Sequence, residues 1–232
     1  MSRAIRVAIE ATSKKAFATA IDWPGWSRSG KTAELALEAL AAYAARYGAV
    51  VDEAGEVLSE EPGDRDRFEI VEEAAGSTGT VFGVPGRVTD ADRRPTSAAE
   101  ADRLRRLVAA AWTTFDRVAA IAPAELRKGP RGGGRDRDKM IDHVIEADGA
   151  YARQIGLRIK VPTTQDRAAV EAMRAAVLEV IGAPSDGSPL ARRKWTARYA
   201  ASRIAWHALD HAWEMEDRTE PAHEPPWRPR AG

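Results

Sequence analysis

The pattern of apolar and polar residues divides the chain into a strand-rich first part and a helical second part. Ile5, Val7 and Ile9 alternate with polar or smaller residues, and after a polar break a second apolar run covers residues 17–23. An alternating period of two is typical of strands with one buried face. The two runs therefore predict a hairpin, and the second run ends at a Pro-Gly pair.

The spacing of apolar residues becomes helical after Thr32. Apolar residues recur at helical intervals up to Tyr47, with Thr32 as the candidate N-cap and Gly48 as the candidate end of the helix. Residues 68–71 predict another strand, and residues 81–84 predict a shorter one. The pattern leaves open a third strand between the hairpin and the helix.

From about residue 97 onward the strand signals stop and four amphipathic helical blocks follow. Each break between these blocks contains Gly or Pro, which interrupt helices. The predicted helices cover residues 97–121, 136–157, 164–182 and 192–216. Four long helices joined in this way are typical of a four-helix bundle.

These patterns predict an α+β fold with two domains and a tail. Charged residues and a proline within residues 90–96 mark the boundary. We expect a small β-β-(β)-α-β domain over residues 1–92, a four-helix bundle over residues 93–216 and a Pro-rich C-terminal tail over residues 217–232.

Composition and charge limit the functional classes. Hydrophobic residues make up 44% of the chain and charged residues 30%, which suits a protein with a buried core. Because Lys+Arg and Asp+Glu both number 35, no net charge draws the protein to nucleic acid or to an anionic membrane. The sequence shows no secretion signal and no apolar stretch close to the ~18 residues of a membrane span, so we expect a cytoplasmic protein.

The histidines form the main candidate site. The chain has no cysteine, so a metal ion must be bound by His, Asp or Glu. His207 and His211 are four residues apart on the predicted fourth helix, and their imidazoles therefore point the same way. His143 on the second helix can face them inside a bundle, which predicts three metal ligands with open coordination positions, an arrangement typical of catalysis. The alternative is that each His is a satisfied, partly buried side chain; His223, in the tail, is interpreted as a surface or packing residue.

The predicted bundle resembles the DinB superfamily of DinB/YfiT-like metalloenzymes, whose members carry one His on the second helix and an HxxxH on the fourth. The matching residues are His143 in the segment IDHVIE and His207 and His211 in the segment IAWHALDH, and the resemblance covers residues 97–216. The resemblance implies a divalent metal ion, zinc or nickel, and a small-molecule substrate. For characterised members it further implies transfer or isomerisation reactions that use a low-molecular-weight thiol as cosubstrate.

Two residues near the histidines are candidates for catalytic roles. Arg203 lies four residues before His207 and is expected to bind an anionic group of the substrate or of the thiol. Glu146 follows His143 by three residues and is a candidate fourth ligand or proton carrier. The alternatives are a surface or salt-bridge residue for Arg203 and a solvated helix face for Glu146. Because the chain has no cysteine and the histidines are committed to the metal, the attacking group is expected to be a metal-bound water or thiolate.

Other residues on these helices have expected supporting roles. The candidate acceptors for the imidazole N–H groups are Asp142, Asp148 and Asp210. Trp206 and Trp213 are seven residues apart and are expected in the core.

Residues 25–32 fit the nucleotide-binding pattern G-x-x-x-x-G-K-[ST] and follow a strand-like run. A P-loop, however, needs a parallel sheet with crossover helices, and Trp26 places a large ring where the loop would surround phosphate. Lys31 is therefore expected to be exposed and to bind no nucleotide.

Residues 16–36 resemble the HicB-type antitoxin domain instead, and this resemblance covers about residues 3–74. In that domain Gly25 and Gly30 are turn residues and Thr32 caps the helix. The resemblance implies a homodimer or a protein partner that binds through the N-terminal domain.

Two functional hypotheses follow from the sequence. The first is a divalent-metal-dependent enzyme, a thiol-dependent S-transferase or isomerase. The alternative is a non-catalytic, metal-stabilised interaction or regulatory protein whose N-terminal domain binds a partner. An open coordination face favours the enzyme, and a fourth protein ligand favours the alternative.

Overall fold

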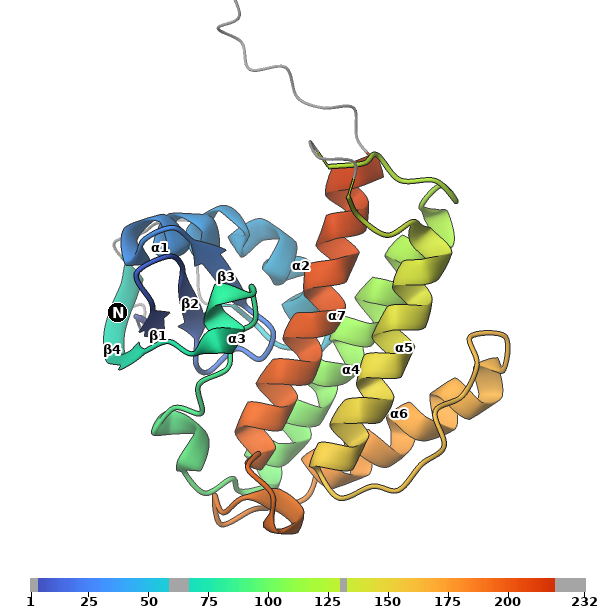
Figure 1. Cartoon of the computed structure of the whole chain (residues 1–232). Coiled ribbons are helices and arrows are strands. Elements are labelled where there is room, and N and C mark those ends of the chain that lie inside the picture. The colour runs from blue at the N-terminus through green and yellow to red at the C-terminus, as the bar shows by residue number, and fades with distance from the viewer. Residues whose placement is uncertain (1–3, 59–66, 130–132, 220–232) are drawn as a thin grey trace, which may run out of the picture.

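The computed structural model describes residues 4–58, 67–129 and 133–219. It is an α+β structure in which a four-stranded sheet with short helices precedes four long helices (Figure 1). We call strands β1–β4 with helices α1–α3 the sheet region, and helices α4–α7 the helical region. None of the described helices combines the length and the apolar character needed to cross a membrane.

The sheet has the strand order β3-β2-β1-β4. Its strands are β1 Ile5–Ala11, β2 Ala16–Ala20, β3 Ser27–Gly30 and β4 Phe68–Ala75. β1 and β2 form the predicted antiparallel hairpin, with Val7 opposite Ala20, and β3 pairs antiparallel with β2. β4 returns parallel to β1. The predicted hairpin, the third strand that the pattern left open and the strand at residues 68–71 are thus all present.

The single helix expected from Thr32 to Gly48 is wrong, because the structure has two helices there. Thr32 does cap the first one, and its hydroxyl accepts a hydrogen bond from the Leu35 N–H. The helices are α1 Ala33–Ala42 and α2 Ala44–Glu53. The backbone breaks at Tyr43, whose side chain packs edge-on against Trp213 of the last helix. Gly48 lies inside α2, and the chain leaves that helix through Gly55, which has a left-handed φ of 67°.

The short strand expected at residues 81–84 is also wrong. Val81 is the last residue of the single-turn helix α3 Thr78–Val81, which begins with a capping box between Ser77 and Thr80, and residues 82–84 follow as a turn and loop. Thr80 is buried and its hydroxyl donates to Glu10 of β1 at 2.8 Å. Phe82 is 79% exposed, so the apolar residues of this segment follow a strand-like spacing without facing the core.

The four predicted long helices are present, with changed ends. They are α4 Ala98–Ile121, α5 Arg137–Gln154, α6 Arg167–Ile181 and α7 Ala197–Thr219. The last helix starts later than expected because Ala191 and Arg192 have left-handed φ angles of 50° and 56°. It also continues through residues 217–219, which the sequence assigned to the tail. The rest of the expected tail, with His223, lies outside the described residues.

Helix α7 joins the two regions because it is buried on both of its sides. Phe17 of β2 meets Trp206 of α7 edge-on, with ring centroids 6.1 Å apart. Gly25 has a φ of 94°, and a Cβ atom there would lie 2.8 Å from Leu209 Cδ1, so the loop after β2 packs directly on α7. One hydrophobic core therefore runs through both regions, and the domain boundary proposed at residues 92/93 stays a prediction.

Candidate metal centre

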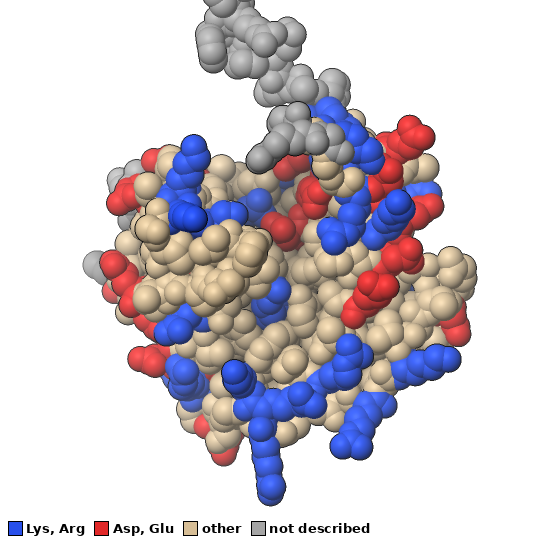
Figure 2. Space-filling view, in the orientation of Figure 1, with Lys and Arg blue, Asp and Glu red and all other residues tan. Residues whose placement is uncertain are grey.

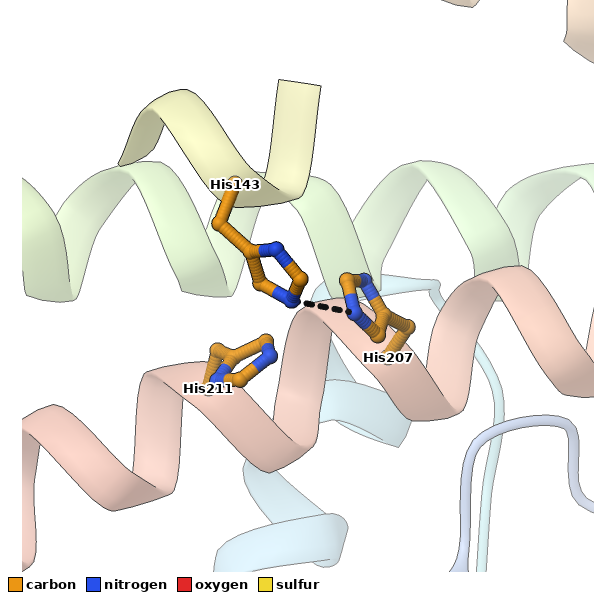
Figure 3. Close-up of side chains that lie close together, drawn as sticks. All are labelled: His143, His207 and His211. Carbon is orange, nitrogen blue, oxygen red and sulfur yellow. Dashed lines mark hydrogen bonds between the residues drawn. The ribbon is translucent and has the colours of Figure 1, made fainter. Parts of the chain in front are cut away.

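The three candidate ligands converge between α5 and α7. His143 comes from α5, and His207 and His211 come from adjacent turns of α7 (Figure 3). The ring centroids are 5.1 Å apart for His143 and His207, 5.0 Å for His143 and His211, and 4.7 Å for His207 and His211. One ligand nitrogen from each ring lies within 4.8 Å of the others. The chain thus brings together the three residues that the sequence proposed as metal ligands.

The spacing of the nitrogens fits a single ion. His143 Nε2 and His207 Nε2 are 3.3 Å apart. Two nitrogens on one tetrahedral ion, with bonds of about 2.0–2.1 Å, are separated by about 3.3 Å. Among the described residues, no further His, Asp or Glu belongs to this group. Three ligands without a fourth protein ligand are the arrangement that leaves a coordination position open.

Burial keeps the imidazoles of His143 and His207 neutral at physiological pH. His207 and His211 are only 6% and 9% exposed. Burial lowers the pKa of His143 to about 4, and the neighbouring His211 and Arg135 contribute in the same direction. Burial also lowers the pKa of His207 well below its ordinary value. A neutral imidazole has a free lone pair, so a metal ion does not have to displace a proton from either residue.

Glu214 is the residue near the site that the sequence reasoning missed as a ligand-orienting group. Its Oε2 lies 3.1 Å from His211 Nδ1, and its Oε1 accepts a hydrogen bond from Arg218. The bond with His211 is the main reason that the pKa of Glu214 is lowered. With Nδ1 engaged by Glu214, Nε2 of His211 remains available to an ion. The signal in the sequence is the spacing HxxxHxxE, which places Glu214 one turn beyond His211.

The three aspartates named from the sequence have other contacts. Asp210 forms an ion pair with Arg28 of β3 at 2.9 Å. Asp148 is buried, accepts a hydrogen bond from Trp112 and pairs with Arg174. Asp142 is exposed. The acceptor that the structure provides for an imidazole is therefore Glu214.

Arg203 is buried on α7, and among the described residues it forms none of the salt bridges expected in the alternative interpretation. Two carboxylates that follow it on the same helix, Asp210 and Glu214, pair with Arg28 and Arg218. The Arg203 guanidinium lies over the rings of Trp206 and Tyr151, with its central carbon 4.5 and 5.2 Å from their centroids. Its predicted contact with an anionic group stays a prediction.

Glu146 has an exposed side chain on α5 and is not a member of the histidine group. Its proposed role as fourth ligand or proton carrier therefore has no support from the geometry and stays a prediction. Trp206 and Trp213 are buried in the core, as expected.

The nucleotide-like segment 25–32 does not form a phosphate-binding loop. Residues Ser27–Gly30 are strand β3, and Trp26 is fully buried with its ring stacked on Tyr47. The Trp26 indole N–H donates to the Leu40 carbonyl. Lys31 is exposed, as predicted. The Gly-rich pattern is therefore explained by the turn into α1.

A scan against protein-family models gave no match, and searches of curated proteins and of solved structures gave none. The resemblances to the DinB superfamily and to HicB-type domains consequently remain expectations that rest on the residues quoted for them. The function is argued below from the geometry of the site.

Proposed function

We propose that this protein is a divalent-metal-dependent enzyme whose ion is bound by His143, His207 and His211. The observation that carries the proposal is the convergence of three imidazoles from two helices, two of them buried and one half-buried, with no fourth His, Asp or Glu among the described residues in the group. Zinc and nickel are the proposed ions, because both accept imidazole nitrogen as ligand. A homodimer, a protein partner of the sheet region and a cytoplasmic location remain further predictions.

The chain's own contribution is to hold three imidazole nitrogens in place. The helical spacing of His207 and His211 fixes two of them on one rigid element, and α5 presents His143 opposite them. Glu214 orients the His211 ring through Nδ1. A divalent ion bound there would supply a Lewis acid that lowers the pKa of a water or thiol bound to it.

The finer proposal is that a low-molecular-weight thiol is the cosubstrate of an S-transferase or isomerase reaction. It is supported by the resemblance of residues 97–216 to the DinB superfamily and by the absence of cysteine from the chain. Because the protein has no thiol of its own, a sulfur nucleophile has to come from a second substrate.

The alternative is a non-catalytic protein in which a structural ion stiffens the helical region. A closed structural site takes four protein ligands, whereas the described residues provide three. The geometry therefore favours the enzyme, and an open coordination position is what an experiment must detect.

Cobalt(II) substitution tests this point directly. The metal-free protein is loaded with cobalt(II), and its visible and near-ultraviolet spectrum is recorded before and after addition of N-acetylcysteine, with N-acetylserine as the matched oxygen control. We expect a new sulfur-to-cobalt charge-transfer band with the thiol alone. The band should be absent in His207→Ala and present in His223→Ala, which removes the histidine outside the proposed site.

Two results would contradict the proposal in different ways. A cobalt spectrum that does not change with any added ligand would identify a closed structural site and favour the non-catalytic alternative. A spectrum that responds to small anions and water exchange but not to the thiol would retain the open metal site and reject the thiol as cosubstrate.

A further inference from the structure

A pocket separate from the histidines lies between the sheet region and α7. It encloses about 590 Å³ with its open mouth included. Its apolar lining includes Ile9, Ile21, Pro85 and Trp206, and Arg203 contributes to its wall. Figure 2 shows the corresponding face hollowed between the sheet region and the helical region. None of the three histidines lines this pocket.

Arg203 is the unusual residue of this pocket. Only 9% of the surface of Arg203 is exposed to solvent. Its Nη1 atom is buried and has no hydrogen-bond partner among the described residues. The guanidinium instead lies over the rings of Trp206 and Tyr151. Aromatic faces attract a cation but accept no strong hydrogen bond, so the donor requirement of this nitrogen is not met by them.

The acidic residues around the pocket are occupied by other groups. Glu10 accepts hydrogen bonds from the Thr80 hydroxyl and from the backbone N–H groups of Gly86 and Arg87. Asp92 accepts both the N–H and the hydroxyl of Thr89. These carboxylates thus stabilise the loop at the pocket wall. Their negative charge also disfavours a ligand that carries several negative charges.

We propose that this pocket binds a small organic monocarboxylate with an apolar body, and that the carboxylate pairs with the Arg203 guanidinium. A carboxylate matches the planar fork of a guanidinium, and it would supply the acceptor that the buried Nη1 lacks once the Arg203 side chain turns this atom toward the pocket. The apolar lining favours a hydrocarbon or aromatic body over a sugar or a nucleotide. Because the lining carries the three carboxylates of Glu10, Glu72 and Asp92 beside the two arginines Arg87 and Arg203, a single negative charge is favoured over a phosphate.

Two aromatic side chains connect the pocket with the metal centre. The Tyr151 ring meets the His207 ring edge-on at 5.5 Å and lies beneath the Arg203 guanidinium at 5.2 Å, and the Trp206 ring, which lines the pocket, lies 6.2 Å from the His207 ring. None of the three histidines lines the pocket, so binding of a ligand to Arg203 does not require the ion. The proposal stands independently of the proposed function.

Binding is tested with the full chain after dialysis against a chelator, so that no ion contributes. Benzoate and hexanoate are the probes, and benzamide and hexanamide are their neutral controls. Saturation-transfer NMR and isothermal titration are recorded for the wild type, Arg203→Met and Arg203→Lys, with Arg87→Met as the matched loss of an exposed arginine on the same pocket.

We expect saturable binding of at least one carboxylate and none of its amide. Arg203→Met should weaken this binding at least about tenfold, the usual scale for loss of a charged hydrogen bond. The affinity of Arg203→Lys for the carboxylate should lie between those of the wild type and Arg203→Met, because lysine keeps the positive charge but lacks the planar, two-pronged guanidinium. Arg87→Met removes an exposed charge from the lining of the same pocket, and it should weaken binding less than Arg203→Met does.

Several results would overturn the proposal. They are absence of saturable binding for both carboxylates, equal binding of acids and amides, and an equal loss in Arg87→Met. Binding that appears only after metal is restored would also overturn it, because the carboxylate would then be a ligand of the ion, a result that leaves the metal centre itself intact.

Discussion

Helix α7 buries two kinds of basic side chain one turn apart. His207 and His211 face α5, where their rings meet His143. Arg203 precedes His207 by four residues and lines the pocket toward the sheet region, and its guanidinium lies over the rings of Trp206 and of Tyr151 on α5. Its Nη1 atom has no hydrogen-bond partner among the described residues.

The difference lies in what burial does to each group. An imidazole can release its proton, and burial accordingly lowers the pKa of His207 until the ring is neutral. A guanidinium keeps its charge in a protein interior. Burial therefore leaves a lone pair on the His207 ring and a positive charge on Arg203, one turn apart on α7. The imidazole suits a cation as ligand, and the guanidinium suits an anion.

The largest loss of metal affinity is expected when one of the three histidine ligands is removed. His207→Ala should lower the affinity for zinc by more than about 100-fold, beyond the 10- to 100-fold typical of residues that only orient a ligand. The helix should persist, because Ala is the better helix former. Competition titration with a chromophoric chelator measures the affinity, and circular dichroism the helix. Retention of wild-type affinity in the folded variant would remove His207 from the site.

The next effect is expected at Glu214. Glu214→Ala removes the acceptor at His211 Nδ1, and zinc affinity should fall by about 10- to 100-fold. Asp142→Ala, the same type of change at an exposed position beside His143, is the control and should bind zinc as the wild type does. The same competition titration measures both variants. Equal affinities would show that the His211 ring needs no support from Glu214.

At Arg203 we expect a smaller effect, and on folding stability instead of metal affinity. Arg203→Met removes a buried charge, so the free energy of unfolding should stay unchanged or rise by up to about 2 kcal/mol. Arg174→Met is the contrasting variant, because Arg174 is buried in ion pairs with Asp116 and Asp148. Its loss should destabilise the fold by about 3–5 kcal/mol. Urea unfolding measures the free energy of unfolding of both variants. A marked destabilisation by Arg203→Met would contradict this expectation and assign that residue a structural role.

The smallest expected effect is a change in the pH dependence of folding stability, and it concerns Asp148, a buried carboxyl that does not contact the histidines. Burial raises the pKa of Asp148 from 3.8 to about 6. Because the folded state then binds this proton more tightly than the unfolded state, the contribution of Asp148 to stability falls as pH rises between about 4 and 6. Asp148→Asn should remove that part of the pH dependence in urea unfolding. Parallel curves for the wild type and the variant over this range would contradict the assignment.

Local spacing was enough to predict much of the fold. The hairpin of β1 and β2 and the cap at Thr32 depend on neighbouring residues, and both are present in the structure. The expectation of a single buried face is wrong for β1, because Ala8 and Glu10 on its second face are buried too. The break at Tyr43 was missed because its cause is remote: the Tyr43 ring packs on Trp213 and its hydroxyl donates to Asp217 of α7. A contact across 170 residues of sequence leaves no periodic signal.

The candidate site was predictable to a different degree for each residue. Helical spacing places His207 and His211 on one face, whereas the position of His143 depended on the expectation of a bundle. Arg203 also shares that spacing with His207, yet it lines the pocket on the sheet side. Its direction is set by stacking on Trp206 and Tyr151, which only the packed structure specifies.

The most direct test of the metal centre is the metal content of the protein purified without an affinity tag. Inductively coupled plasma mass spectrometry of the wild type should find a divalent ion, zinc or nickel, in a one-to-one ratio with the chain. His207→Ala purified in parallel should contain none, while His223→Ala should match the wild type. A metal-free wild-type protein that also fails to bind zinc or nickel on titration would contradict the account, as would an ion that persists in His207→Ala.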